Sequence, residues 1–213
     1  MAALIIDAQL EKDLISQRRD QGTDKYDEVW DGVYVMAPMP NDEHQFLVKE
    51  LTTILTIAVD WVGLGETRPG VNVSDRRDDW RKNFRCPDVA VFLNDTQAEN
   101  HGAFWLGGPD LAIEIVSPGE NPRDKVPFYA KVATRELLVV DRDPWTLRLY
   151  QLQQNELSEV GTSTLQDANL MSSAVVPLSW QIIRAETGLA LQVRHHDLQQ
   201  EWLIALSGAE ADG

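Results

Sequence analysis

The chain of 213 residues is 43% hydrophobic and 25% charged, and it carries a single cysteine, Cys86. These values indicate one globular domain with a sizeable core, exclude an intramolecular disulfide, and suit the reducing cytosol. The net charge of −15 argues against a protein that coats nucleic acid, because phosphate neutralisation requires lysine and arginine, and no apolar run approaches the roughly 18 residues of a membrane span.

The N-terminal part is predicted to hold a helix and a hairpin. The short apolar run of residues 2–6 has no basic segment before it, so it is not a signal peptide, and we expect a cytoplasmic protein. Residues 8–20 are predicted to form a short polar helix. Two apolar runs flank Asp31-Gly32, a dipeptide that tolerates positive φ, which predicts a tight hairpin over residues 28–36.

A long amphipathic helix is expected next. Asn41 or Asp42 can cap its start, and apolar residues at three- and four-residue steps continue to about Trp61. His44 therefore lies in the first turn, on or near the buried face.

The middle of the chain alternates strands and polar loops. Residues 67–73 and 84–93 are predicted as strands, with a charged loop over 74–83 between them and another loop over 94–108. Residues 68–87 hold six bases and three acids, a local balance of +3 on an acidic chain. Such a patch can steer a polyanion to one face, although a solvated loop of mixed charge explains it equally well. The candidate nucleic-acid contacts are Arg76, Arg77, Arg81, Lys82 and Arg85.

The second half combines strands with one more helix. Residues 110–118 and 136–141 are predicted as buried strands, and a helix is expected between them from about Pro122 or Asp124 to Ala133. A tail rich in antiparallel strands follows.

This order predicts an α/β (α+β) fold with a mixed central sheet flanked by helices, and with extra antiparallel strands toward the C-terminus. We expect one domain over residues 26–206, an N-terminal extension over 1–25 and a frayed acidic tail over 207–213.

Glu114 is the anomalous residue of the strand at 110–118. Its neighbours Ile113 and Ile115 are apolar, and an ionised carboxylate among them is costly unless a partner, hydrogen bonds or a metal compensates it. An ion pair with an arginine would suffice. The alternative is a carboxylate that binds metal at the end of a strand.

A second carboxylate favours the metal hypothesis. Asp88 follows Pro87 at the start of another apolar strand. An aspartate at such a position often serves only to stabilise a turn. Carboxylates from two neighbouring strands can also converge on Mg²⁺ (or Mn²⁺), which polarises a phosphoryl oxygen and activates a water. Lys125 and Lys131 on the next helix are the candidate cations beside that water, unless both are surface lysines.

Asp88 in Pro-Asp, then Glu114 on a strand, then a lysine, resembles the PD-(D/E)XK nuclease superfamily. The plain motif has the lysine two residues after the second carboxylate, where this chain has Val116; part of the superfamily carries it on the following helix. The wider pattern resembles the Uma-type family of putative restriction-endonuclease-like proteins over about residues 26–150. The matching pieces are Glu28, Asp31-Gly32, Met36-Ala-Pro38, His44, Pro87-Asp88-Val89, Pro109-Asp-Leu111, Glu114-Ile-Val-Ser-Pro118, Asp124-Lys125, Tyr129, Glu136 and Val140-Asp141.

The resemblance implies a restriction-endonuclease-like fold and a set of roles. Asp88 and Glu114 would bind the metal, and Lys125, four residues before Tyr129, would be the relocated lysine. Glu28 and His44 would complete the catalytic site, the first as a ligand of a metal-bound water and the second as a phosphate contact or proton carrier.

Two functions follow as hypotheses. The first is a Mg²⁺-dependent endonuclease that hydrolyses phosphodiester bonds of DNA, acting as a homodimer because duplex DNA has a pseudo-twofold axis. The second is a catalytically silent protein of the same fold that serves as a dimeric interaction or regulatory module, which the acidic charge favours. Cys86 is expected to be a small core residue, and His195-His196 point to opposite faces of a strand, which disfavours a shared metal site.

Overall fold

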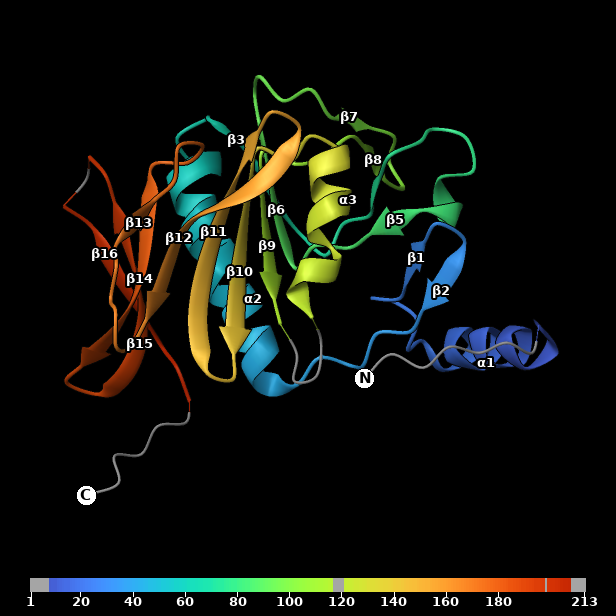
Figure 1. Ribbon diagram of the computed structural model, residues 1–213, viewed down its shortest axis with the longest axis horizontal. Coiled ribbons are helices and arrows are strands. Elements are labelled where there is room, and N and C mark those ends of the chain that lie inside the picture. Colours follow the sequence, from blue (N-terminus) through green and yellow to red (C-terminus); the bar gives the residue numbers. More distant parts are fainter. Residues whose placement is uncertain (1–7, 117–120, 198, 208–213) are drawn as a thin grey trace.

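The computed structural model describes residues 8–116, 121–197 and 199–207. In this part of the chain, three sheets and a small number of helices form the mixed α+β architecture that the sequence predicts (Figure 1). Most of the predicted acidic tail, residues 208–213, lies outside the described residues. Among the helices that the model describes, none has both the length and the apolar character needed to cross a bilayer.

The central sheet has the strand order β12-β11-β10-β9-β6-β3. Its one parallel pair is β9 with β10, in which Leu111 is opposite Glu136, and the other neighbours are antiparallel. A parallel pair needs a crossover, which the segment containing helix α3 (Val126–Lys131) provides. The strands are β3 (Gly65–Pro69), β6 (Val89–Leu93), β9 (Leu111–Ile115), β10 (Glu136–Arg142), β11 (Trp145–Gln153) and β12 (Glu156–Thr164).

Each face of the central sheet has its own hydrophobic core. Ile113 and Ile115 of β9 belong to the core that faces helix α2 and the C-terminal strands. Ala112 and Val116 belong to the core on the other face, which includes residues of α3. Because strand residues alternate between faces, Glu114 lies on the α3 side with Ala112 and Val116.

Helix α2 (Asp42–Leu55) begins where the sequence predicts, because the side chain of Asn41 accepts a hydrogen bond from the backbone N–H of His44. Its last part departs from the prediction, since residues Thr56–Asp60 form a π-helical turn, η1. The other helices are α1 (Ala8–Gln21), the 3₁₀ turns η2 (Trp80–Lys82) and η3 (Pro122–Asp124), and α3 (Val126–Lys131). The last helix is therefore shorter than predicted.

A second sheet of short strands, in the order β2-β1-β5-β4-β8-β7, carries the predicted hairpin. The single strand expected over 84–93 is wrong: it breaks at Cys86-Pro87, because proline cannot donate to a ladder. The first predicted strand, 67–73, breaks as well, and the expected loop over 94–108 contains two short strands. The strands of this sheet are β1 (Glu28–Trp30), β2 (Val33–Val35), β4 (Val73–Ser74), β5 (Phe84–Arg85), β7 (Glu99–Asn100) and β8 (Trp105–Leu106).

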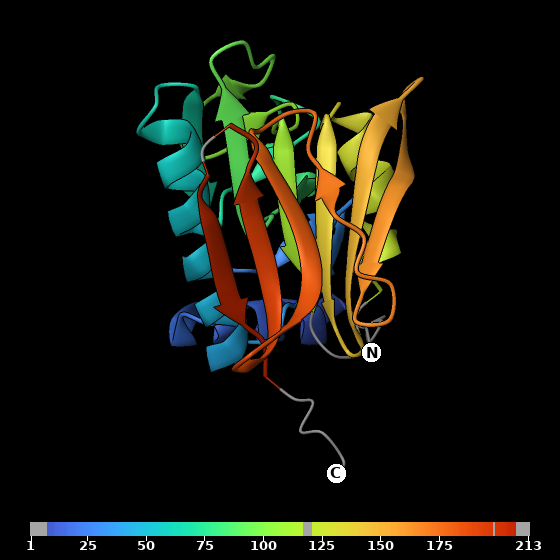
Figure 2. The same cartoon turned by 90° about the vertical axis from the view of Figure 1, so that its left-hand side faces the viewer.

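The C-terminal strands form a third, antiparallel sheet that lies beside α2 on one side of the central sheet, away from α3 (Figures 1 and 2). Trp180 and Leu191 point from it into the shared core. Its strands are β13 (Met171–Ser172), β14 (Leu178–Ala185), β15 (Gly188–His195) and β16 (Glu201–Ala205).

The pairing of β6 with β9 positions the two predicted metal ligands. Val89 is opposite Ile113 and Ala90 is opposite Ala112. Continuing this register by one residue sets Asp88 opposite Glu114, and directly opposed residues of an antiparallel pair point to the same face.

Candidate active site

Glu114 is compensated by a lysine and a tyrosine from one helix. The ammonium Nζ of Lys125 lies 2.9 Å from Oε2 of Glu114, and the hydroxyl of Tyr129 donates a hydrogen bond to Oε1. Lys125 is the residue just before α3, and Tyr129 lies one turn later, so both side chains reach the same carboxylate. The partner is thus a lysine and not an arginine.

Glu28 supplies a second carboxylate to the same ammonium. Its Oε1 lies 2.9 Å from Nζ of Lys125 and also accepts the backbone N–H of Cys86 at 2.8 Å. Its Oε2 accepts the indole N–H of Trp30 at 2.7 Å. Figure 1 shows why this is possible: the start of α3 lies between the end of β9 and hairpin β1–β2.

Asp88 immediately precedes the first residue of β6 and lies next to His44. Its Oδ2 accepts the backbone N–H of Ile115 at 2.7 Å, which fixes the carboxylate beside the end of β9. Its Oδ1 lies 3.1 Å from Nε2 of His44 in the first turn of α2. The other ring nitrogen, Nδ1, is buried and has no hydrogen-bond partner among the described residues. His44 therefore contacts the Asp88 carboxylate through one ring nitrogen, Nε2.

Burial and like charges perturb the titration of this cluster. Burial raises the pKa of Glu114 to about 8, and Asp88 and Glu28 add to the effect while Lys125 opposes it. Burial alone would lower the pKa of Lys125, but the charges of Glu114 and Glu28 outweigh it and raise the pKa well above its ordinary value. Lys125 is therefore an ammonium at neutral pH, and Glu114 ionises only at a cost.

The five predicted catalytic residues form two groups at adjoining strand ends. Glu28, Glu114 and Lys125 form one connected group, and His44 with Asp88 forms another at the adjoining strand end. Of the two candidate lysines, Lys125 reaches these carboxylates, whereas the described contacts of Lys131 lead elsewhere, to an aspartate of the charged loop.

Two residues of the cluster were not predicted as functional. Tyr129 is completely buried against Glu114, and burial together with that carboxylate raises its pKa well above the ordinary value. Trp30 binds the far oxygen of Glu28. The available signals were spacings: Tyr129 follows Lys125 by one helical turn, and Trp30 follows Glu28 by two residues on the same face of a strand.

The five predicted nucleic-acid contacts divide into two groups. Arg85 lies in β5 and is only 4% exposed, so its side chain is not presented at the surface as a phosphate contact would require. The other four lie at the surface of the charged loop. Their partners are Asp75 for Arg76, Glu99 for Arg77, the Trp80 ring for Arg81, and Asp79 for Lys82.

Two other sequence candidates, the side chains of Cys86 and His196, have different surroundings. Burial raises the pKa of the Cys86 thiol to about 12, as suits a small core residue. His196 contacts the hydroxyl of Ser179.

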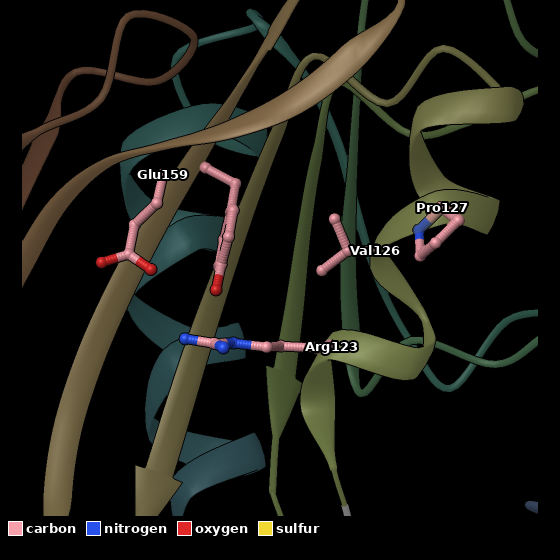
Figure 3. Close-up of a pocket in the computed structure, with 5 residues that line it drawn as sticks. Arg123, Val126, Pro127 and Glu159 are labelled. Carbon is pink, nitrogen blue, oxygen red and sulfur yellow. The ribbon is translucent and has the colours of Figure 1, made fainter.

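A hollow of about 270 Å³ lies where η3 and the start of α3 face strands β11 and β12 (Figure 3). Figure 3 shows Arg123 reaching from η3 toward the strands and Glu159 projecting from β12 into the same space. None of the five predicted catalytic residues lines it. Its lining is Arg123, Val126, Pro127, Tyr150 and Glu159.

Comparisons with known proteins agree with this fold. Residues 12–192 match the family model Uma2, described as "Putative restriction endonuclease". The fold is also that of a putative nuclease belonging to DUF820 from Anabaena variabilis ATCC 29413, known from its crystal structure, with a TM-score of 0.54 and 19% sequence identity over 70% of this chain and 80% of that one. At this identity the likeness shows the fold alone. No curated protein matches the chain.

Proposed function

The chain belongs to the Uma2 family of putative restriction endonucleases, and from that premise we propose that it is a metal-dependent endonuclease that hydrolyses phosphodiester bonds of DNA. One observation carries the proposal. The ammonium of Lys125 lies 2.9 Å from both Glu28 and Glu114 at the end of a buried strand, and Asp88 stands at the neighbouring strand end.

The donor set fits a divalent cation. Asp88 accepts the backbone N–H of Ile115, the residue after Glu114, so the two carboxylates stand at adjoining strand ends. Glu114 shares the ammonium of Lys125 with Glu28. Burial raises the pKa of Glu114, and the negative charges of Asp88 and Glu28 add to the effect. A further cation would relieve it.

Asp88 and Glu114 are the residues that would hold Mg²⁺ or Mn²⁺. The described residues contain no group of three or more His, Cys, Asp or Glu side chains suited to a metal ion. Two carboxylates suit Mg²⁺, which often binds through one or two carboxylates and keeps several waters. The bound ion would polarise a phosphoryl oxygen and lower the pKa of a water.

The side chains around it have separate tasks in this proposal. Lys125 is partly exposed and remains an ammonium, so it orients the attacking water and offsets negative charge on the phosphate without accepting a proton. Tyr129 holds Glu114 in place, and Glu28 holds the ammonium of Lys125. His44 orients Asp88 through Nε2.

The charged loop would contact the DNA backbone. Its ion pairs are largely exposed and therefore weak, so Arg77 and Lys82 can exchange their carboxylate partners for phosphates. We propose Arg76, Arg77, Arg81 and Lys82 as the contacts, without Arg85. A homodimer, which would match the pseudo-twofold axis of duplex DNA, is part of the same proposal.

A plasmid-nicking assay with Mg²⁺ or Mn²⁺ tests the proposal, with EDTA as the metal-free reference. We expect Asp88→Asn, Glu114→Gln and Lys125→Met to abolish nicking. Lys131→Met is the matched control, because that lysine is on the same helix but contacts Asp75 at 2.6 Å, and it should keep wild-type activity.

Nicking that survives Asp88→Asn or Glu114→Gln would overturn the assignment of the site. A wild-type protein with neither Mg²⁺ binding in calorimetry nor salt-dependent DNA affinity would instead support the catalytically silent module.

A further inference from the structure

Arg85 is a buried cation that forms no ion pair with any described residue, and its Nε has no hydrogen-bond partner there. Its Nη1 donates to the carbonyl oxygens of Val29 and Phe84, each at 3.0 Å, and to Oδ1 of Asn83 at 3.2 Å. Burial lowers the pKa of Arg85, and the charge of Glu28 opposes this from beyond ion-pair distance. Further contacts that stabilise the buried charge therefore matter.

Two aromatic rings provide that stabilisation. The guanidinium carbon of Arg85 lies 4.5 Å from the centre of the Trp30 ring and 4.3 Å from that of the Phe128 ring. These are cation–π distances, and desolvation strengthens the attraction. A planar guanidinium can stack between two rings, whereas the compact ammonium of a lysine cannot do so in the same way.

The two rings belong to the two elements that must meet at the candidate active site. Trp30 is in strand β1 of the hairpin, and Phe128 is in α3, three residues after Lys125. The ladder between β1 and β5 consists of a single residue pair, Val29 with Phe84. The side chain of Arg85 therefore adds to the attachment of the hairpin, beside the hydrogen bonds from the backbone N–H groups of Asp31 and Gly32 to residues 82–83.

The same contacts fix both oxygens of Glu28. Trp30, stacked on Arg85, donates its indole N–H to Oε2 at 2.7 Å. Cys86, the next residue after Arg85, donates its backbone N–H to Oε1 at 2.8 Å. Glu28 is thus held where its Oε1 also meets Lys125.

We propose that Arg85 is a positioning residue that stacks between Trp30 and Phe128, aligns Glu28 with Lys125, and does not contact DNA. The alignment stands on these contacts alone. Its consequence for catalysis rests on the proposed endonuclease function.

The first test is spectroscopic and needs no nuclease activity. The chain has seven tryptophans, so ¹⁵N-labelled protein gives one indole N–H signal for each, and Trp30→Phe identifies the signal of Trp30. We expect Arg85→Met to shift this signal and to speed its exchange with water, and Arg85→Lys to do so less strongly. The other six indole signals should stay in place.

Arg81→Ala is the matched control, since Arg81 lies over the ring of Trp80 at 5.1 Å and should move only the signal of that tryptophan. Arg85→Lys retains the charge and keeps the test decisive if Arg85→Met does not fold. An unchanged Trp30 signal in a folded Arg85 variant would overturn the proposal.

The second test separates positioning from phosphate contact. Arg85→Lys should lower kcat by about 10- to 100-fold, because misplaced catalytic groups cost that much, while KM for DNA and the salt dependence of binding stay unchanged. A raised KM and a shallower salt slope with unchanged kcat would mark Arg85 as a phosphate contact and refute the inference. If the wild type shows no nicking at all, the proposed function fails, and the indole signal still decides whether Arg85 positions Trp30.

Discussion

Replacing Glu114 with glutamine should make the metal-free protein more stable while it removes activity. Glutamine has nearly the same shape and can still accept from Tyr129 or Lys125, but it carries no charge. Burial, Asp88 and Glu28 raise the pKa of Glu114 to about 8 against the opposing effect of Lys125. The ionised carboxylate is thus a cost to folding at neutral pH.

The size of this cost follows from linkage between protonation and folding. The pKa of Glu114 in the folded protein, about 8, lies above the ordinary value of 4.5. Protonation of Glu114 therefore stabilises the folded state. This contribution to the free energy of unfolding is fully present below about pH 4.5 and is lost as the pH rises to about 8. Each pKa unit corresponds to about 1.4 kcal/mol, so at about pH 7 the loss is on the order of 3 kcal/mol.

Urea denaturation in EDTA at about pH 5 and about pH 8 measures the effect, since the midpoint follows the free energy of unfolding. The wild type and Glu114→Gln should have similar midpoints at the lower pH, and Glu114→Gln should be the more stable protein at the higher pH. Glu156→Gln, at an exposed position of β12, is the control and should follow the wild type at both.

Magnesium provides the complementary measurement. A ligand at about 100 times its Kd stabilises the state that binds it by about 2.7 kcal/mol, so Mg²⁺ should raise the stability of the wild type and leave Glu114→Gln unchanged. If Glu114→Gln is less stable than the wild type at both pH values, the ionised carboxylate stabilises the fold through its ion pair, and the reasoning is refuted.

Three further predictions concern the scaffold around the site. The Cys86 thiol, buried and with its pKa raised to about 12, should resist iodoacetamide in the native protein and react after unfolding, as mass spectrometry would reveal; rapid native labelling would contradict this. Gly65→Ala should lower the free energy of unfolding by about 1–3 kcal/mol in urea, because a Cβ there would lie 2.3 Å from the carbonyl oxygen of Phe92; an unchanged midpoint would count against the close approach. For Asp75, burial alone would raise the pKa, but hydrogen bonds, chiefly from Arg76, outweigh it and lower the pKa. Asp75→Asn should therefore cost about 2 kcal/mol at neutral pH, with the gap to the wild type narrowing below about pH 4; a gap that is constant with pH would show that the charge is not its source.

Elements specified by local chemistry could be predicted from the sequence. The hairpin needs positive φ at its turn, and Asp31 and Gly32 adopt φ of 48° and 91°. Helix α2 needs a cap, which Asn41 provides. In each case the signal and the structure that it specifies lie within a few residues of each other.

Elements specified by distant partners could not be predicted in the same way. Strands β7 and β8 have two residues each and exist because β8 pairs with β4, some thirty positions earlier in the chain. Their sequence has no alternation long enough to mark a strand. The π-helical turn after α2 could not be predicted either, because the periodic apolar pattern of that segment would suit an ordinary helix.

The same distinction explains what the sequence revealed about the site. It identified five chemically distinctive residues, yet the contact between Glu28 and Lys125 joins positions 97 residues apart. No local pattern specifies that contact. Arg85 shows the consequence most clearly. Within a run of charged residues an arginine resembles a phosphate contact, and the sequence does not reveal that the rings of Trp30 and Phe128 pack against its guanidinium.

Val116 occupies the position, two residues after Glu114, at which the plain motif has its lysine. It lies on the same face of β9 as Glu114 and is 7% exposed, within the core that contains Phe128 and Tyr129. In this chain the ammonium reaches the carboxylate from the start of α3 instead, with Tyr129 one turn later on the second oxygen. A helix that supplies both partners of Glu114 must stay aligned with the strand and also with the hairpin that supplies Glu28. A lysine on the strand itself would need neither alignment. If Lys125 has the proposed role, its position before α3 makes the cluster depend on the stacking that we propose for Arg85.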